Sequence, residues 1–369
     1  MNLIERARAW VAADPESEHR DAVQQLLAEG DQGQLAELFS GRLAFGTAGL
    51  RAPLGPGPNR MNRMVVRQTT QGLLRWMAGR GLERPRVVIG YDARHGSLDF
   101  ANEVAEVVAG AGGESILSDQ VVPTPVLANA IRTHEAHAGV MITASHNPRA
   151  DNGYKLYLGD GIQIIPPADH EIAGAIDEIA AGAASAVFGE SCDVQRVPAR
   201  RWIAAHREQS IALIPGPERS ARVVYTAMHG VGGQPFVTAA LEAGFQRPIA
   251  VGEQFDPDPD FPTVSFPNPE EPGAFDRVMA VAQKHDADVA LANDPDADRL
   301  AAVVRPSLGE PASRVLTGDE LGVLLADHVL THTSGGDRLT ACSVVSSGQL
   351  ARLAARHGVR PVMVRPSKA

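Results

Sequence analysis

The sequence predicts tandem α/β domains in which helices alternate with short apolar strands. The chain has 369 residues, more than one hydrophobic core usually supports, so two or three domains are expected. Hydrophobic residues make up 44% and charged residues 21%, which is ordinary for a globular protein. Short apolar runs alternate with segments of helical period, the pattern of βαβ units in a parallel sheet.

The first predicted domain spans residues 1–210 and begins with a helical extension. Residues 1–39 show helical spacing with a break at Asp14-Pro15, and the Gly-rich segment 45–59 predicts a loop. The alternating elements that follow are a helix at 65–79, a strand at 86–91, a helix at 99–111, a strand at 138–143 and a helix at 200–210. The Ala-rich run near 179–186 is interpreted as the end of a surface helix.

The pattern restarts after the Pro-Gly-Pro at 215–217, which places a second domain at 211–310 and a third at 311–369. The predicted elements of the second domain are a strand at 222–226, a helix at 234–243, a Pro- and Asp-rich loop at 256–272, a helix at 275–285 and a strand at 287–292. The third offers a helix at 319–330, a strand at 339–345 and a helix at 349–357.

Composition excludes several classes of partner. The net charge of −10 argues against general binding to nucleic acid or to an anionic membrane, which Lys and Arg mediate. Two cysteines, Cys192 and Cys342, provide neither a disulfide framework nor a Cys-rich zinc site. The N-terminus lacks the continuous apolar core of a signal peptide, and no stretch approaches the roughly 20 apolar residues of a membrane span. We therefore expect a cytoplasmic protein.

A serine that could carry chemistry follows the predicted strand at 138–143. Ser145 lies in Thr143-Ala-Ser-His-Asn-Pro, at the carboxyl end of a strand, where open α/β sheets place their ligands. His146 is beside it, but a hydrolase would need a histidine that reaches the serine and an orienting acid. The Gly-x-Ser-x-Gly elbow of esterases is absent around Ser145, which disfavours that interpretation.

Three carboxylates follow another predicted strand. Asp294, Asp296 and Asp298 alternate in Asn293-Asp-Pro-Asp-Ala-Asp-Arg, a spacing that lets oxygen atoms converge on a hard cation such as Mg²⁺. An EF-hand is excluded, because its sixth and twelfth positions would be Arg299 and Arg305 rather than Gly and Glu. A solvated acidic turn is the alternative.

The serine and the carboxylates complement each other, because a phosphorylated Ser145 would supply the further oxygen that Mg²⁺ requires. Phosphoryl transfer depends on this charge neutralisation and on positioning. Arg51 in a Gly-rich turn and Lys155 shortly after Ser145 add donors, and Lys155 could act as general acid or base. Taken alone, either could be ordinary surface charge.

These residues resemble the α-D-phosphohexomutases, in the branch of phosphoglucomutases and phosphomannomutases. The motifs that carry the resemblance are Phe45-Gly-Thr-Ala-Gly-Leu-Arg, Tyr91-Asp-Ala-Arg, Thr143-Ala-Ser-His-Asn-Pro, Asp151-Asn-Gly-Tyr-Lys, Met228-His-Gly-Val-Gly-Gly and Asp294-Pro-Asp-Ala-Asp-Arg. The resemblance covers most of the chain and implies tandem α/β domains with mixed, mainly parallel sheets.

The resemblance implies an intramolecular phosphotransferase that interconverts hexose 1-phosphate and hexose 6-phosphate, with glucose or mannose as the sugar. Ser145 resembles the phosphoserine that makes and reclaims a sugar 1,6-bisphosphate. The three aspartates resemble Mg²⁺ ligands that share the ion with the Ser145 phosphate. The active-site groups of the family that steady the phosphate or move protons are matched by Arg51, His146, Lys155 and Arg299. Either His146 or Lys155 could be the proton shuttle.

The chain departs from the family pattern near its C-terminus. The match extends to about Gly358, and the sugar-reading loop of the third domain and the whole fourth, phosphate-gripping domain are not visible in the sequence. We therefore expect an incomplete third domain with exposed apolar surface, and impaired turnover. The alternative function is an inactive remnant that binds Mg²⁺ and phosphosugar. A haloacid-dehalogenase-type phosphatase is disfavoured, because its Thr and Lys motifs are missing.

Overall fold

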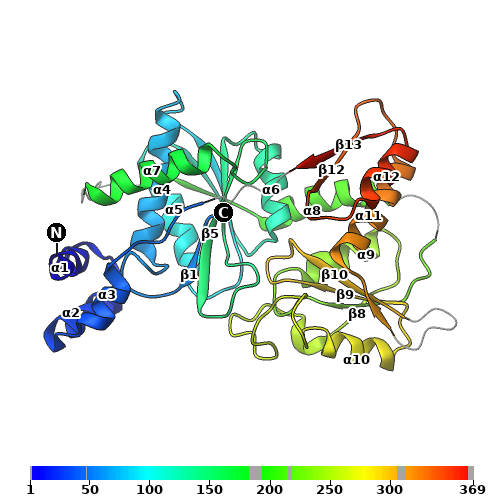
Figure 1. The fold of residues 1–369 in the computed structure, drawn as a ribbon, viewed down its shortest axis with the longest axis horizontal. Coiled ribbons are helices and arrows are strands. Elements are labelled where there is room, and N and C mark those ends of the chain that lie inside the picture. The colour runs from blue at the N-terminus through cyan, green and yellow to red at the C-terminus, as the bar shows by residue number, and fades with distance from the viewer. Residues whose placement is uncertain (1, 47, 183–192, 215–217, 306–312, 365–369) are drawn as a thin grey trace. The chain divides into compact units, whose positions relative to one another are not determined.

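The computed structural model describes residues 2–46, 48–182, 193–214, 218–305 and 313–364. The chain divides into two compact units. Unit 1 comprises residues 1–203 together with 258–266, and unit 2 comprises 204–257 and 267–369. Figure 1 shows the elements of both units along the chain. The predicted three-domain boundaries at 210 and 310 stay predictions, and the Pro-Gly-Pro at 215–217 lies outside the described residues.

Unit 1 is a six-stranded mixed sheet with helices on both faces. Its strands are β1 (Leu50–Pro53), β2 (Arg86–Tyr91), β3 (Glu114–Ser118), β4 (Ala138–Ile142), β5 (Asp151–Leu158) and β6 (Val194–Val197). Their spatial order is β1-β5-β4-β2-β3-β6, with β4, β2, β3 and β6 paired in parallel and β5 antiparallel to both β1 and β4. Its helices are α1 (Leu3–Ala13), α2 (Ser17–Glu29), α3 (Gln32–Phe39), α4 (Arg63–Ala78), α5 (Ser97–Gly110), α6 (Thr124–Thr133), α7 (Ala168–Ala181) and α8 (Ala199–Ile211), of which the last crosses into unit 2.

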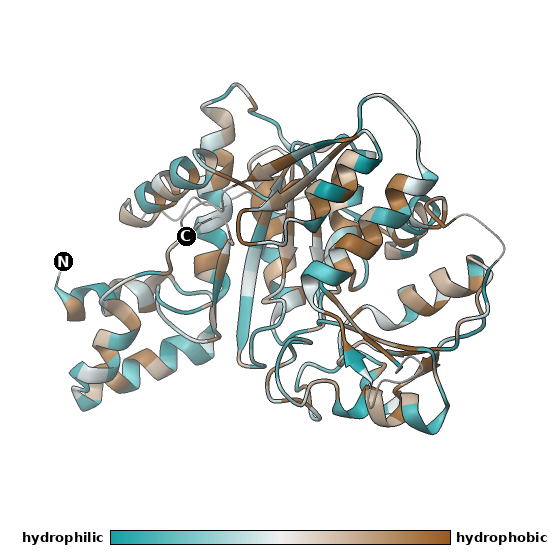
Figure 2. Cartoon of the chain, turned by 45° about the vertical axis from the view of Figure 1, so that its right-hand side comes forward, coloured by the Kyte–Doolittle hydropathy of each residue, from teal (hydrophilic) through white to brown (hydrophobic). Residues whose placement is uncertain are grey.

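Successive residues of the central strands pack into different cores, because side chains alternate across a sheet. In β2, Val87 and Ile89 join the larger core with α4 and α5, whereas Val88 joins the core that contains α6. All five residues of β4 are buried, as expected for a strand covered on both faces. The helices carry both polar and apolar stretches, visible as teal and brown in Figure 2.

The N-terminal extension, predicted to be helical with a break, consists of three short helices. A capping box between Asn2 and Glu5 starts α1, and Gly30, with φ +70°, ends α2 in the left-handed region. The predicted break at Asp14-Pro15 is confirmed, because residues 14–16 separate α1 from α2. Trp10 and Phe39 pack edge to face across the extension, 6.1 Å between ring centroids.

Unit 2 contains a five-stranded mixed sheet and a smaller two-stranded one. The larger sheet has the order β11-β10-β9-β7-β8, and the smaller pairs β12 with β13 in parallel. The strands are β7 (Val223–Thr226), β8 (Ile249–Ala250), β9 (Val289–Asn293), β10 (Leu300–Val304), β11 (Arg314–Val315), β12 (Leu339–Ser343) and β13 (Arg360–Val364). The helices are α9 (Gly233–Glu242), the 3-10 turn η1 (Gly252–Gln254), α10 (Asp276–Lys284), α11 (Gly318–His332) and α12 (Gln349–Arg356).

The last segment of the chain has little core of its own. Leu330, Ala354 and Val359 form its buried cluster, while Leu324 and Leu325 of α11 are 58% and 55% exposed. The exposed apolar surface expected there is thus present in residues 313–364. Residues 360–364, which the sequence analysis left outside the family pattern, form β13, and residues 365–369 lie outside the described part.

Two details of the predicted elements were wrong or incomplete. The segment 45–59 was predicted to be a loop, but Leu50–Pro53 forms β1, an edge strand that exists through its pairing with β5. Arg51 therefore lies on a strand rather than in a Gly-rich turn. The strands β5 and β10, whose antiparallel pairing makes both sheets mixed, were not among the predicted elements. The predicted helix end near residues 179–186 is described only to residue 182.

Candidate active site

Ser145 lies directly after the carboxyl end of β4, as the sequence predicts, and its backbone is unusual. Its φ is +53°, in the left-handed region that residues other than glycine rarely adopt, and the residue is 1% exposed. Such a conformation costs roughly 1–3 kcal/mol and persists only when the surroundings hold it. Contacts with neighbouring residues must therefore hold this turn.

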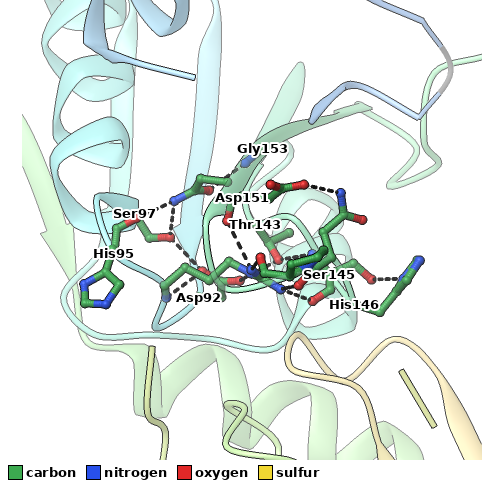
Figure 3. Close-up of polar contacts among 12 residues, drawn as sticks. Asp92, His95, Ser97, Thr143, Ser145, His146, Asp151 and Gly153 are labelled. Carbon is green, nitrogen blue, oxygen red and sulfur yellow. Dashed lines mark hydrogen bonds and ion pairs between the residues drawn. The ribbon is translucent and has the colours of Figure 1, made fainter. Parts of the chain in front are cut away.

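A chain of buried hydrogen bonds holds the Ser145 backbone (Figure 3). Its N–H donates to Thr143 Oγ1 at 2.8 Å, and that hydroxyl donates to Asp92 Oδ2 at 2.6 Å. Asp92 follows β2 and also accepts from the hydroxyl of Ser97, at 2.7 Å. Burial raises the pKa of Asp92, while the Arg94 guanidinium and the hydrogen bonds from Thr143 and Ser97 oppose the rise. The turn is thus anchored through one hydroxyl to a buried acid.

Arg94 fixes the outside of the same turn. Its Nε lies 3.3 Å from Asp92 Oδ2, and its side chain is buried. Its two Nη atoms donate to four carbonyl oxygens, those of Ser145 (2.7 Å), Asn147 (2.6 Å), Pro148 (2.8 Å) and Asp151 (3.1 Å). Only the planar, multi-donor guanidinium can serve so many acceptors at once. Arg94 therefore acts as a clamp on the loop between β4 and β5.

His146 is within hydrogen-bonding distance of the serine hydroxyl. Its Nδ1 lies 3.3 Å from Ser145 Oγ, and Figure 3 shows the two side chains facing each other. The imidazole and the Phe266 ring pack edge to face, with 6.0 Å between their centroids. Phe266 belongs to the segment 258–266, which is part of unit 1, and Phe261 of that segment lies under the Arg94 guanidinium at 4.9 Å. Two aromatic rings thus pack on the residues around Ser145.

Lys155 lies on β5, which pairs with β4, and Arg51 lies on the edge strand β1, which pairs with the other side of β5. Lys155 on β5 is opposite Met141 of β4 and is 2% exposed, and Arg51 on β1 is opposite Gly153 of β5. The Arg51 Nε is buried and has no hydrogen-bond partner among the described residues. A buried, unsatisfied guanidinium N–H suits an anionic ligand.

Gly153 makes this close strand arrangement sterically possible. A Cβ at this position would lie 2.6 Å from the carbonyl oxygens of both Leu50 and Thr143. No side chain fits there, so the glycine lets β1 and the start of the Ser145 loop approach β5. The glycine of the motif Asp151-Asn-Gly-Tyr-Lys is therefore required for the packing of these strands.

The three aspartates lie in unit 2, in the loop between β9 and β10. Asp294 and Asp296 are fully buried and Asp298 is exposed, and one carboxylate oxygen of each lies within 4.8 Å of the others. The N–H of Arg299 donates to Asp294 Oδ1 at 3.0 Å, and Ala297 adopts a positive φ of +55°. Buried carboxylates this close repel one another, so the cluster suits a hard divalent cation bound through oxygen.

A second turn packs against the aspartate loop. The N–H of Val231 donates to the carbonyl of Pro295 at 2.8 Å, and a Cβ on Gly230 would lie 2.3 Å from Pro295 Cα. Burial raises the pKa of Tyr225, as does the nearby Asp294 charge, and its hydroxyl donates to Asn293 Oδ1 at 2.8 Å. The segment Met228-His-Gly-Val-Gly-Gly thus supports the loop that carries the carboxylates.

A residue of positive φ is held in the same way after a strand in both units. In unit 2 the Thr226 hydroxyl accepts from the Met228 N–H at 3.1 Å and donates to Gln254 Oε1 at 2.8 Å, and Met228 has φ +48°. This repeats the relation of Thr143 to Ser145 and Asp92. In both units, the residue with positive φ donates its N–H to the hydroxyl of a threonine two positions earlier.

Sequence reasoning assigned no role to Asp92, Arg94 or Thr143. Their motifs were recognised as family signatures, but nothing in the sequence showed that the three side chains meet around one turn. Of the predicted site residues, the structure brings Ser145 and His146 into contact, places Arg51 and Lys155 on the adjoining strands, and clusters the three aspartates with Arg299 next in the loop.

Comparison with known proteins agrees with this architecture. The model described as phosphoglucomutase/phosphomannomutase, alpha/beta/alpha domain I, matches residues 42–183, and the model of domain II matches residues 201–307. A probable phosphomannomutase from Haemophilus influenzae is 43% identical over 308 residues, which cover 80% of this chain and 61% of that protein. The human phosphopentomutase is 37% identical over an alignment of 381 positions, which covers 96% of this chain and 62% of that protein.

A solved structure shows the same fold. The putative phosphomannomutase from Thermus thermophilus superposes with a TM-score of 0.70 at 24% identity, covering 88% of this chain and 69% of that one. This chain spans about three fifths of the length of the curated relatives it matches. None of the helices in the described residues combines the length and apolar character needed to cross a bilayer.

Proposed function

Because the chain belongs to the phosphoglucomutase/phosphomannomutase family, to which two domain models assign residues 42–183 and 201–307, we propose that it is a phosphosugar mutase. The reaction would interconvert hexose 1-phosphate and hexose 6-phosphate, with glucose or mannose as the sugar, in the cytoplasm. The observation that carries the proposal is the strained Ser145 turn, held by Thr143 and Arg94. Relatives named phosphomannomutase and phosphopentomutase support the reaction class.

In the proposed chemistry Ser145 carries the phosphoryl group on Oγ. A sugar hydroxyl attacks the phosphorus and gives its proton to a general base, while the bond from phosphorus to Ser145 Oγ breaks and a general acid protonates the leaving Oγ. The product is a sugar 1,6-bisphosphate, which reverses its orientation and returns its other phosphate to Ser145. Phosphoryl transfer needs positioning more than covalent chemistry, and a serine whose backbone is held on both sides is suited to it.

The proton is proposed to move through His146 or Lys155. His146 is within reach of the serine, because its Nδ1 lies 3.3 Å from Ser145 Oγ. Lys155 is nearly fully buried on the neighbouring strand β5, and a lysine amine is one of the side chains that act as general acid or base. Arg51, Lys155 and Arg299 are proposed to bind the phosphate groups of the substrate, and the unsatisfied Nε of Arg51 supports this role.

Asp294, Asp296 and Asp298 are proposed to hold Mg²⁺, and the Ser145 phosphate is proposed as a further ligand. The donor set fits the ion, since Mg²⁺ prefers hard carboxylate oxygens and shares its shell with phosphate. When bound, the ion would neutralise charge on the transferring phosphoryl group. It would also relieve the repulsion between two buried carboxylates that lie this close together.

The first experiment separates the serine chemistry from complete turnover. The purified chain is incubated with Mg²⁺ and ³²P-labelled glucose 1,6-bisphosphate, and label on the protein is measured beside a coupled assay of glucose 1-phosphate conversion. Labelling is expected in the parent chain and in Ser210→Ala, a control on α8, and should fall about a thousandfold in Ser145→Ala. Equal labelling of Ser145→Ala would contradict the assignment.

The same assay addresses the alternative and the sugar. A chain that labels Ser145 but does not convert glucose 1-phosphate or mannose 1-phosphate would be the inactive remnant. Faster conversion of a pentose phosphate would overturn the hexose assignment and leave the serine role in place.

Metal binding is tested separately by titration with Mn²⁺ as a spectroscopic substitute for Mg²⁺. Asp296→Asn is expected to weaken binding by at least about tenfold, because it removes a buried charged ligand. Asp286→Asn is the matched control, since Asp286 is an exposed aspartate of the same unit outside the cluster. Equal affinities of the two variants would exclude the cluster as the metal site.

A further inference from the structure

Unit 1 contains a cavity that the proposed reaction does not use. It has a volume of about 440 Å³ and lies between the N-terminal helices α1 and α3, helix α4 and the C-terminal end of α7. Figure 1 shows α1, α3 and the end of α7 on the same side of the unit. None of its lining residues belongs to the Ser145 loop or to the hydrogen-bond network around it. The volume falls in the range of about 300–1,000 Å³ typical of small-molecule sites.

The walls of this cavity are mostly apolar. Trp10 and Phe39 supply aromatic surface from the N-terminal extension, and Met64 and Ile179 supply aliphatic surface from α4 and α7. Such walls suit a hydrophobic body and do not suit a sugar, whose hydroxyl groups each need a polar partner.

The charged groups in the lining are predominantly basic. Arg6, Arg42 and Arg67 face a single acidic residue, Asp177. Arg67 is already committed, because its Nε donates to Glu103. Two guanidinium groups therefore remain to meet one carboxylate, which leaves a local excess of positive charge.

These two arginines carry buried donors that the described residues do not satisfy. The Nε atoms of Arg6 and Arg42 are buried and have no hydrogen-bond partner among the described residues. Arg42 donates from Nη2 to Gln68 at 3.1 Å, but its Nε is 3.9 Å from Asp177, too far for a hydrogen bond. Burial lowers the pKa of Arg42, with Asp177 opposing the shift, and an arginine still remains charged at neutral pH. A guanidinium whose Nε–H is buried without a hydrogen-bond partner is stabilised by an anion.

We propose that this cavity binds an organic anion, in which one carboxylate or phosphate group is carried on an apolar chain or ring. The anionic group is bound by Arg42 and Arg6, and the apolar body packs against Trp10 and Met64. This ligand differs from the phosphosugar in needing an apolar body, and it occupies a place separate from the Ser145 loop. The cavity is thus a second ligand site of unit 1.

The proposal is tested on the full chain by calorimetric titration with octanoate. Two comparison compounds separate the contributions: octanol has the same body without the charge, and inorganic phosphate has charge without the body. Octanoate is expected to bind one site at least about tenfold more tightly than either. Tryptophan emission should change on binding, and the change should be lost in Trp10→Phe, which places the ligand at the cavity.

Charge variants complete the test. Arg42→Gln is expected to weaken octanoate binding by at least about tenfold, as is Arg6→Gln, which serves if Arg42→Gln unfolds. Arg8→Gln removes the same charge from an exposed position of α1 outside the lining and should change the affinity less than about twofold. Equal binding of octanol, equal weakening in Arg8→Gln, or no saturable binding at about 10 mM octanoate would each overturn the proposal. The readout is binding, so it does not depend on mutase activity.

Discussion

Replacing Thr143 with valine should destabilise unit 1 well beyond an ordinary lost hydroxyl. Valine keeps the shape of the side chain, but it leaves the Ser145 N–H without its acceptor at 2.8 Å and removes the 2.6 Å hydrogen bond to Asp92. A buried donor left unpaired costs about 1–3 kcal/mol, and a hydrogen bond to a charged group contributes about 1.5–3 kcal/mol. Because the two losses share one hydroxyl, we expect a total of about 2–5 kcal/mol.

The matched control is Thr69→Val in α4. Thr69 is also buried, but its hydroxyl donates only to the Val65 carbonyl at 2.8 Å, an oxygen that the helix already pairs. Its loss should cost about 0.5–1.5 kcal/mol. Urea unfolding of both variants measures the difference, and hydrogen exchange should show faster exchange of the Ser145 amide in Thr143→Val alone. A cost no greater than that of Thr69→Val, or an unchanged exchange rate, would refute the reasoning.

Three further predictions concern the same unit. Gly153→Ala should lower the free energy of unfolding by at least about 2 kcal/mol, because its Cβ would lie 2.6 Å from two carbonyl oxygens. Gly174→Ala, at a helical position with open space, should instead raise it by about 0.5–1 kcal/mol, and chemical unfolding measures both. Arg94→Lys should lower the free energy of unfolding by at least about 2 kcal/mol, because an ammonium keeps the charge but cannot donate to four carbonyl oxygens. The variant should also lose most of its phosphorylation in the labelling assay, and a stability equal to that of the parent would contradict the clamp. The hydrogen bond to Glu16 raises the pKa of His19 above 6.5, although burial opposes the shift. Burial also opposes the shift of Glu16, but the hydrogen bond to His19 lowers the pKa of Glu16 below 4.5. The ion pair therefore stabilises the folded state most between about pH 4.5 and 6.5, and this contribution is lost as the pH rises through the raised pKa of His19. His19→Gln should therefore lower the melting temperature more at about pH 5.5 than at about pH 8.5, and an equal loss at both would exclude the ion pair.

The sequence was sufficient for the elements with strong local signals. The helix at 65–79 and the strand at 86–91 are confirmed by α4 and β2, because their apolar spacing matches the surface they bury. The α/β class, the mixed sheets and the resemblance to the α-D-phosphohexomutases are confirmed as well. The site residues and the metal stay predictions, supported by where the side chains lie.

What the sequence did not predict depends on contacts between distant segments. The strand β1 is four residues long and ends in Pro53, so its propensity is weak and its pairing with β5 determines it. The positive φ of Ser145 is not a conformation that serine favours, and the contacts with Thr143, Asp92 and Arg94 impose it. The predicted loop at 256–272 is correct as a loop, but its tertiary role could not be read from composition.

That loop has a consequence for how the gene can be divided. Residues 258–266 belong to the unit of Ser145 although both flanking segments belong to the other, so the backbone passes between the units three times. A shortened gene that stops at Ile203 would encode the Ser145 loop without the rings of Phe261 and Phe266. The unit that contains Ser145 is thus discontinuous in the gene, and an insertion or deletion near residue 260 would alter the surroundings of a serine more than a hundred positions upstream.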